Sequence, residues 1–304
     1  MRLVYFGTSD FAVPPLRALS DGAVLVVSQP DRPAGRGKKL RVSPVKIAAE
    51  EMGVPVLTPE RARDPEFVED IRQLEADALV VASYGQILSE ALLLSAKRGG
   101  INLHASILPK FRGAAPIHRA ILEGESETGV TLMQMDRGMD TGDIIAIETL
   151  PMGPDETAGE LETRLSSLAA RMAAKWLPIV VSGDYQRMPQ NDVLATLAPK
   201  LSREKGILSF HMSSEEAYRR HRACTPRPGS RIKTRLGVVK IVEARRAQGN
   251  GEPGKVLSVG QNGVAVAFAK GALNLLRVQL EGKQSIPAND FANGHRLSTS
   301  SSLA

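Results

Sequence analysis

Residues 3–27 of the chain read LVYFGTSDFAVPPLRALSDGAVLVV, and this stretch decides the fold class. The apolar run Leu3–Phe6 stops at Gly7, and Phe11–Leu19 follows with the apolar spacing of an amphipathic helix. Ala23–Val27 is a second apolar run. Two short apolar runs joined by a helical segment are typical of a βαβ unit, so an α/β domain with a parallel sheet is predicted.

The alternation of strand and helix continues through the first half of the chain. Ser43-Pro44 and Asp64-Pro65 each place proline after an N-cap residue, which is typical of a helix start. Further strands are expected at Ala78–Ala82, Gly100–His104, Val130–Met135 and Ile144–Leu150. Short apolar strands separated by helices predict a sheet that is covered on both faces.

A long helix is predicted after this region. The capping box Thr157-Ala-Gly-Glu160 opens it, and its apolar stripe runs from Leu161 to Ile179 at helical spacing. Trp176 lies in that stripe and is therefore expected in the core. The polar stretch Ser182–Arg203 contains glycine and prolines and is typical of a linker.

The last third of the chain has a different pattern. A second capping box, which begins at Ser213, predicts a helix there. The segments that follow this helix are short, alternate in hydrophobicity and are separated by glycine-rich turns, which predicts a small β-barrel or sandwich. The Ser/Thr-rich end, Ser298–Ala304, is expected to be a frayed tail. We therefore expect an N-terminal domain over residues 1–188, a linker over 189–205 and a C-terminal domain over 206–304.

Charge is distributed unevenly along the chain, whose formal net charge is +6. Residues 1–205 hold 24 Lys and Arg against 27 Asp and Glu, whereas residues 206–304 hold 15 against 6. A basic second domain indicates an anionic partner such as nucleic acid, although basic residues also solubilise small domains. With only four aromatic residues in this region, RNA would bind through its phosphates and shape and not through base stacking.

The composition excludes several classes of protein. With 42% hydrophobic and 24% charged residues, the chain is neither disordered nor collagen-like. Cys224 is the single cysteine, so no internal disulfide can form, as is usual in a reducing compartment. The N-terminal apolar run is short and no apolar run reaches about 18 residues. We therefore expect no secretory signal and no membrane segment, and a cytoplasmic protein.

Two polar side chains lie near the end of the predicted strand Gly100–His104. Asn102 and His104 are two residues apart, so an extended strand directs both to one face. The carboxyl ends of parallel strands are where open α/β sheets bind ligands. There an asparagine amide can donate to a developing oxyanion and a histidine can exchange protons near neutral pH. The alternative is that His104 only caps the strand end.

The turn Met139-Asp-Thr-Gly-Asp143 supplies a candidate acid. Asp140 would orient His104 if the turn folds across the strand end; otherwise it stabilises only its own turn through an Asx hydrogen bond. Asp-Thr-Gly also occurs in aspartic proteases, but the βα pattern of this chain excludes that all-β class.

The segment Asp31–Arg41 is predicted to be a basic loop. It carries five cationic residues, and Pro33, Gly35 and Gly37 are expected to prevent a regular element. Its position after the second strand favours an anionic partner over a merely solvated surface loop. Gly7-Thr-Ser-Asp10 lacks the three-glycine dinucleotide fingerprint and is interpreted as a tight turn, with a phosphate site as the alternative. No histidine has metal-like spacing to Cys or acidic partners, so no metal is expected.

Several of these motifs occur in an order that resembles the folate-dependent formyltransferases. The motifs are Asn102-Leu-His104, Ser106-Ile-Leu-Pro109, Arg112-Gly-Ala-Ala-Pro116 and Met139–Asp143. Gln29–Lys39 and Ser43-Pro-Val-Lys46 resemble the branch of that family that acts on methionyl-tRNA. The resemblance implies a Rossmann-like, mostly parallel N-terminal formyltransferase domain and an OB-like C-terminal β-barrel that binds tRNA. It also implies an enzyme of translation initiation that transfers a formyl group from 10-formyltetrahydrofolate to the α-amine of methionine on initiator tRNA.

The resemblance also implies roles for residues at matching positions. The catalytic residues would be Asn102, His104 and Asp140. Residues that contact the folate would be Ser106, Ile107, Leu108, Pro109, Tyr84, Gly85, Thr141, Gly142 and Asp143. Residues of the basic loop that contact tRNA would be Arg36, Lys38, Lys39 and Arg41. The protein is expected to be a monomer.

The C-terminal domain departs from the family at two places. Thr225-Pro-Arg-Pro-Gly229 stands where the family usually has Asn-Pro-Trp-Pro-Gly, and Phe210-His211 stands near a usual tryptophan. One alternative function is formyl transfer to a small amine such as glycinamide ribonucleotide or an amino sugar, which leaves the basic domain and loop unexplained. Another is a non-catalytic RNA-binding relative, which is expected to lack one of the three catalytic residues, whereas all three are present.

Overall fold

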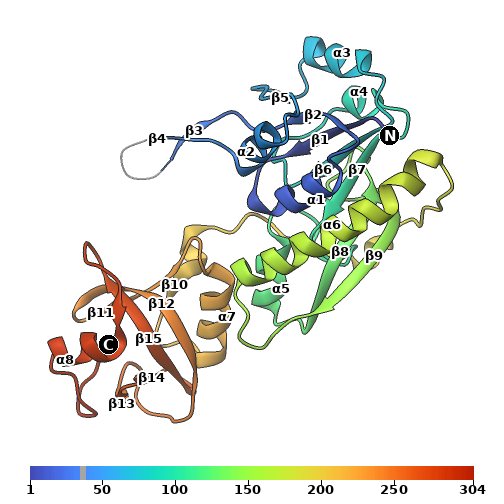
Figure 1. Cartoon of the computed structure of the whole chain (residues 1–304). Helices are drawn as coiled ribbons and strands as arrows, with labels where there is room; N and C mark the ends of the chain where they lie inside the picture. Colours follow the sequence, from blue (N-terminus) through green and yellow to red (C-terminus); the bar gives the residue numbers. More distant parts are fainter. Residues whose placement is uncertain (35–38) are drawn as a thin grey trace. The chain divides into compact units, whose positions relative to one another are not determined.

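The fold is that of a computed structural model, which describes residues 1–34 and 39–304; for Pro33, Ala34 and Lys39 it describes the backbone alone. The chain divides into two compact units (Figure 1). The first comprises Met1–Pro116, Glu127–Pro151 and Glu162–Pro199, and the second comprises Ile117–Ser126, Met152–Leu161 and Lys200–Ala304. Two segments from the middle of the chain therefore belong to the second unit, and the stretch up to Pro199 belongs to the first.

The first unit is built on a seven-stranded sheet with the order β5-β2-β1-β6-β7-β8-β9. Neighbouring strands from β5 to β7 are parallel, whereas β8 is antiparallel to both of its neighbours. The strands are β1 (Leu3–Gly7), β2 (Ala23–Val27), β5 (Val56–Leu57), β6 (Ala78–Ala82), β7 (Gly100–His104), β8 (Glu127–Gln134) and β9 (Ile144–Pro151). The predicted Rossmann-like, mostly parallel sheet is confirmed.

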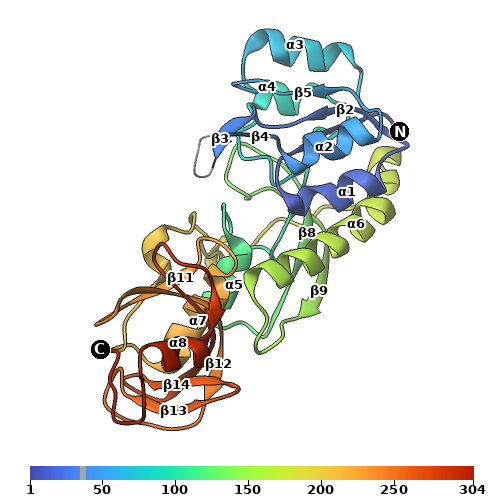
Figure 2. The ribbon, with the colours of Figure 1, turned by 60° about the vertical axis from the view of Figure 1, so that its left-hand side comes forward.

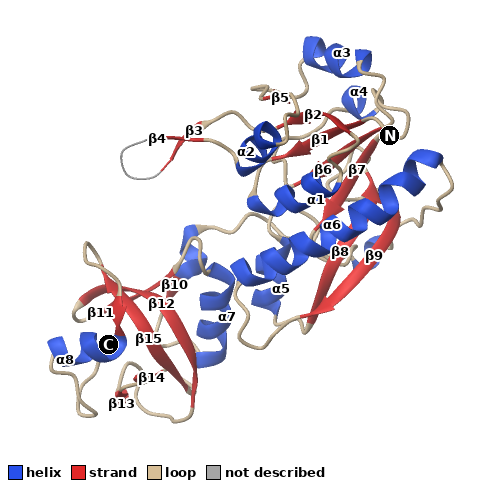
Figure 3. Cartoon of the chain, in the orientation of Figure 1, coloured by secondary structure: helices blue, strands red, loops and turns tan. Residues whose placement is uncertain are grey.

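Helices surround this sheet, and a short hairpin extends from it (Figures 2 and 3). The helical segments are η1 (Asp10–Ala12), α1 (Val13–Ala18), α2 (Pro44–Glu51), α3 (Pro65–Gln73), α4 (Glu90–Leu93), α6 (Ala158–Ser182) and η2 (Asp192–Leu194). The hairpin pairs β3 (Arg32–Ala34) with β4 (Lys39–Arg41). Among the described residues, no helix is long and apolar enough to cross a membrane.

Alternate residues of the buried strands pack on opposite faces of the sheet. On one face, Val4 and Phe6 belong to a core cluster with residues of α3 and α4. Tyr5 is directed to the other face, where it is fully buried and its hydroxyl donates to Ala12 O at 2.6 Å. Because both faces are covered, the strand is apolar throughout and not alternating.

The long helix α6 follows the predicted stripe for most of its length. Leu161 and Leu165 are fully buried, as expected. Near its end the buried face includes Leu177 and Val180, whereas Trp176 is only half-buried, so the expectation of a core tryptophan is wrong.

The second unit contains a separate, mainly antiparallel sheet with the order β10-β11-β12-β15-β14-β13, and β16 pairs with β15. Its strands are β10 (Ile207–Leu208), β11 (Ser230–Thr234), β12 (Gly237–Ala247), β13 (Val256–Gly260), β14 (Gly263–Ala267), β15 (Ala272–Leu280) and β16 (Ile286–Pro287). Its helices are α5 (Pro116–Glu123), η3 (Arg203–Gly206), α7 (Ser214–Cys224) and α8 (Ala288–Gly294). The sheet encloses an apolar core that includes Tyr218 and Phe268, as expected of a small barrel-like domain, although the pairings among the described residues form an open path.

The C-terminal tail is packed, so the expectation of a frayed end is wrong. Leu303 is buried; its N–H donates to Gly254 O at 2.8 Å and its carbonyl accepts from Arg235 N at 3.0 Å. Ser302 forms a bridge with Lys255. The Ser/Thr-rich composition of Ser298–Ala304 suggests a mobile tail, but the buried side chain of Leu303 anchors the segment.

Candidate active site

Strand β7 places Asn102 and His104 side by side at its carboxyl end. The two residues lie opposite Met133 and Thr131 of β8, and both therefore face the same side of the sheet. Their exposed fractions are 9% for Asn102 and 6% for His104. Two polar side chains in a largely apolar strand are thus held in a partly dry environment, where hydrogen bonds are stronger than in water.

Asp140 joins this pair from the turn between β8 and β9. Its Oδ1 accepts from Asn102 Nδ2 at 3.2 Å, and its Oδ2 lies 3.6 Å from His104 Nδ1. Oδ2 also accepts from Gly113 N at 2.8 Å. The structure therefore brings together the three side chains that the sequence analysis expected to be catalytic.

The orientation of His104 is set by its second ring nitrogen. Nε2 lies 2.9 Å from the carbonyl oxygen of Phe111, which can only accept, so Nε2 carries a proton. Nδ1 consequently faces the Asp140 carboxylate and forms an ion pair with it whenever it is also protonated. Asn102 has a second Nδ2 proton, for which the described residues supply no acceptor. The site thus offers one unused amide donor beside a histidine and a carboxylate.

The segment after β7 forms one border of the site. Ser106 is fully buried; its hydroxyl donates to Lys110 O at 2.6 Å, and its carbonyl accepts from Thr131 Oγ1 at 2.6 Å. Leu108 packs in a small apolar cluster, whereas Ile107 and Pro109 are half-exposed. Of the four residues expected to contact folate here, Ser106 and Leu108 can offer mainly their backbone.

The loop after β6 forms another border. Tyr84 O accepts from Thr8 Oγ1 at 2.8 Å and from Gln29 Nε2 at 3.3 Å, which connects the ends of β1, β2 and β6. The Tyr84 ring packs edge-on against Phe6 in the core, and burial raises the pKa of its hydroxyl to about 12. A cavity of about 300 Å³ adjoins the loop and is lined in part by Gln29 and Gly85. Gly85 therefore borders open space, whereas Tyr84 presents only its backbone.

The turn that carries Asp140 is closed by its own side chains. Asp136 Oδ1 accepts from Thr141 Oγ1 at 2.8 Å, so the Thr141 hydroxyl is used within the turn. A Cβ at Gly142 would lie 1.9 Å from Gln134 O, so only glycine fits there. Asp143 O accepts from Gln134 N at 2.9 Å, while its carboxylate is partly exposed.

Comparisons with known proteins identify the family. Residues 1–177 match the Formyl transferase family and residues 200–296 match the Formyl transferase, C-terminal domain. The methionyl-tRNA formyltransferase of Citrifermentans bemidjiense is 43% identical over 98% of this chain and 94% of its own length. That of Sorangium cellulosum is 45% identical over 98% of this chain and 97% of its own. The chain belongs to the methionyl-tRNA formyltransferase family.

Two solved structures share the fold of this family member. The N-formyltransferase of Helicobacter canadensis, in complex with folinic acid and dTDP-3-aminofucose, has a TM-score of 0.68 at 19% identity and covers 90% of this chain and 98% of its own. HypX from Aquifex aeolicus in complex with tetrahydrofolic acid has a TM-score of 0.66 at 17% identity and covers 96% of this chain and 47% of its own.

Two contacts of this formyltransferase site were missed by the sequence analysis. Gln190 Nε2 donates to Asp140 O at 2.8 Å and to Gly142 O at 2.7 Å. The backbone N–H of Gly113 donates to the Asp140 carboxylate. Gln190 lies in the stretch interpreted as a linker and belongs to no periodic pattern. The Arg112-Gly-Ala-Ala-Pro116 motif marks Arg112 and Gly113 as members of the site, but a motif does not reveal which distant residues they contact.

The basic loop is only partly described. Arg41 lies in β4 opposite Arg32 of β3 and is exposed. Arg36 and Lys38 lie outside the described residues, and of Lys39 only the backbone is described. Within the described parts of the chain, no group of three His, Cys, Asp or Glu is placed to hold a metal ion.

Proposed function

We propose that this protein transfers the formyl group of 10-formyltetrahydrofolate to the α-amine of methionine on initiator methionyl-tRNA. The observation that carries the proposal is the meeting of Asn102, His104 and Asp140 at the carboxyl end of β7. Relatives named for this activity match nearly the whole chain.

The three side chains have complementary tasks in this reaction. When bound, 10-formyltetrahydrofolate supplies the formyl carbon, to which the methionine amine forms a new C–N bond. The unused Nδ2 proton of Asn102 donates to the formyl oxygen as it gains charge, and one such donor typically contributes about 10²–10³ in rate. A protonated His104, whose two ring nitrogens face Phe111 O and Asp140, places its positive charge beside that oxygen. Asp140 holds the His104 ring and, through a water, accepts the proton that the amine loses. That proton reaches the folate nitrogen as its bond to the formyl carbon breaks.

We assign the folate to the space between three borders of the site. The loop after β6 contributes Gly85 and the backbone of Tyr84. The segment after β7 contributes Ile107 and Pro109 together with the backbone of residues 106 and 108, and the Asp140 turn contributes residues 141–143.

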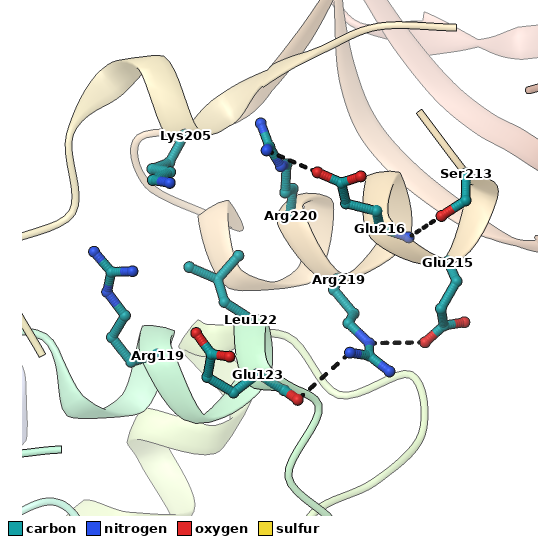
Figure 4. Close-up of a pocket in the computed structure, with 9 residues that line it drawn as sticks. All are labelled: Arg119, Leu122, Glu123, Lys205, Ser213, Glu215, Glu216, Arg219 and Arg220. Carbon is teal, nitrogen blue, oxygen red and sulfur yellow. Dashed lines mark hydrogen bonds and ion pairs between the residues drawn. The ribbon is translucent and has the colours of Figure 1, made fainter. Parts of the chain in front are cut away.

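We assign tRNA phosphates to two basic surfaces, one in each unit. In the first unit the surface is the β3–β4 hairpin with Arg41 and, outside the described residues, Arg36 and Lys38. In the second unit it is a cavity of about 300 Å³ between α5 and α7, where Figure 4 shows Arg119 and Lys205 on one side of Leu122.

The charge balance of this second cavity favours an anion near Arg119. The two α7 cations, Arg219 and Arg220, form ion pairs with glutamates four residues earlier, at 2.9 and 2.8 Å. By contrast, Arg119 Nε is buried without a hydrogen-bond partner, and the described residues supply no ion-pair partner for Lys205. An unpaired guanidinium beside an ammonium is well suited to a phosphate.

One assay tests the proposed function. The protein is incubated with 10-formyltetrahydrofolate and methionine-charged initiator tRNA, and formylmethionine is detected after release from the tRNA. Formylation of initiator tRNA well above charged elongator tRNA is the expected result. Formylation of glycinamide ribonucleotide or an amino sugar in place of tRNA supports the small-amine alternative. Binding of tRNA without any formyl transfer supports a non-catalytic RNA-binding protein.

We further propose that the protein acts in the cytoplasm as a monomer. Size-exclusion chromatography with light scattering should give the mass of one chain, and a mass of two chains would contradict this part of the proposal.

A further inference from the structure

We infer that Gln190 is a positioning residue for formyl transfer and that Arg112 holds it in place. The inference rests on the proposed function and extends it to two side chains outside the Asn102, His104 and Asp140 group.

The backbone of Asp140 needs an external restraint. Its φ is 54°, in the left-handed region that is unfavourable for a residue with a Cβ. Gln190 Nε2 donates to the carbonyl oxygens on either side of Thr141, at 2.8 Å to Asp140 O and 2.7 Å to Gly142 O. Both amide protons of Gln190 thus hold the peptide groups that aim the Asp140 carboxylate at His104.

Arg112 determines which way the Gln190 amide points. Arg112 Nε and Nη2 donate to Gln190 Oε1 at 3.0 and 2.8 Å. A guanidinium has only donors, so Oε1 must face it and Nε2 must face the two carbonyls. Arg112 is itself 7% exposed, and its Nη2 also donates to Asp192 Oδ1 at 2.7 Å. The amide therefore has one orientation in which all of its groups are satisfied.

The segment that carries Gln190 is bonded on both sides of it. Met188 and Ile144 exchange two backbone hydrogen bonds of 2.8 Å. Farther along, Ala198 N donates to Arg112 O at 2.7 Å and Arg112 N donates to Thr196 O at 2.8 Å. Gln190 therefore lies on an extended segment, residues 188–198, that backbone hydrogen bonds fix to the first unit on both sides of Gln190.

Loss of the two Gln190 hydrogen bonds should therefore act on the chemical step. A displacement of about 1 Å at a reacting group can lower a rate by about 10²-fold. Gln190 lies in neither of the two surfaces assigned to tRNA phosphates, so tRNA binding should be retained. The turn that it holds also borders the space assigned to the folate. We expect kcat to fall by about 10- to 100-fold while the KM for methionyl-tRNA stays unchanged.

The test compares three variants of the full-length protein. Gln190→Glu has nearly the same size and keeps a partner for Arg112, but a carboxylate cannot donate to the two carbonyls. Gln190→Leu removes both functions. Asp192→Asn is the matched control, because the Asp192 side chain is 81% exposed and an asparagine amide oxygen can still accept from Arg112 Nη2. Formylation kinetics are measured for both substrates over a range of pH, together with thermal unfolding.

The inference requires that Gln190→Glu and Gln190→Leu lose kcat alike, with a changed pH–rate profile because the Asp140–His104 geometry relaxes. Asp192→Asn should behave as the unsubstituted protein does. Unchanged kcat in Gln190→Glu would overturn the inference while leaving the proposed function intact. If the unsubstituted protein does not formylate methionyl-tRNA, the proposed function fails and this inference fails with it.

Discussion

Asp140 illustrates how much of this site depends on single residues in unusual conformations. Its left-handed backbone is compensated by Gln190, and its carboxylate accepts hydrogen bonds from Asn102 and the Gly113 N–H. The carboxylate is thus held beside His104 by one side-chain amide and one backbone N–H, while Gln190 holds the backbone of the same residue.

Asp140→Asn should reduce turnover by about 10²–10⁴-fold, because the amide cannot pair with a protonated His104 or accept a proton. Binding of tRNA should be nearly unchanged, since it depends on basic groups elsewhere. Single-turnover formylation and a filter-binding assay measure the two effects. Asp184→Asn is the control, because this exposed aspartate of the first unit lies outside the Asp140 turn. Normal turnover in Asp140→Asn would refute its role.

His221 makes the second unit sensitive to acid. Its side chain is buried and Nδ1 lies 2.8 Å from Ser230 Oγ. Burial, with the nearby Arg245 and Arg222, lowers the pKa of His221 to about 4. In the unfolded chain the imidazole has its ordinary pKa of about 6.5. The unfolded state therefore binds the proton first as pH falls.

The stability of the second unit should consequently be complete above about pH 6.5 and decline toward pH 4, by up to about 3 kcal/mol for this one group. Urea unfolding at several pH values measures the decline. His221→Gln should flatten it, whereas His211→Gln, at an exposed histidine, should leave it unchanged. An identical decline in His221→Gln and the unsubstituted protein would exclude His221 as its source.

Among the secondary-structure elements, α6 shows how local signals set a boundary. Thr157 N donates to Glu160 Oε2 at 2.8 Å, and Glu160 N donates to Thr157 Oγ1 at 3.4 Å. This reciprocal pair is the capping box that the sequence predicts. The hydrogen bonds from Thr157 lower the pKa of Glu160, so the cap stabilises the helix above the ordinary carboxyl pKa and weakens as pH falls through the lowered one.

Thr157→Ala should lower the free energy of unfolding by about 1 kcal/mol at neutral pH, because Glu160 N at the start of the helix loses its acceptor and the Glu160 carboxylate loses the Thr157 hydroxyl donor. Chemical denaturation measures the change. Ser167→Ala, on an exposed face of the same helix, should be neutral or slightly stabilising. A Thr157→Ala variant as stable as the unsubstituted protein would show that packing alone sets the helix start.

In the whole molecule, the proposed catalytic residues and most of the excess positive charge lie in different parts of the chain. The groups around Asp140 lie in the first unit, whereas most of the excess Lys and Arg lies in the last third of the chain. A positive net charge by itself indicates only that some anionic partner binds. Because the positive charge is divided between the β3–β4 hairpin and the second unit, we predict two separate sets of contacts with tRNA phosphates.

Arg119→Ala should weaken tRNA binding and reduce the slope of log K against log salt by about 0.7–0.9, the loss expected for one phosphate contact. Glu123→Gln in the same cavity should strengthen binding, because it removes a negative charge near that phosphate. Binding titrations at several salt concentrations measure both, and folate binding serves as the control. If neither substitution changes tRNA binding, the cavity between α5 and α7 is not a phosphate site.

Local patterns in the sequence were sufficient to predict the β1–α1–β2 unit, the bounds of β7 and the placement of Asn102 and His104 on one face. Such features depend on residues within a few positions of each other. Only the folded chain shows that Leu303 anchors the tail, that the stretch up to Pro199 packs with the first unit, and that Gln190 holds the Asp140 turn. Gln190 is 50 positions from Asp140 and 78 from Arg112. No local periodicity encodes such contacts, because they arise when distant segments meet around a common core.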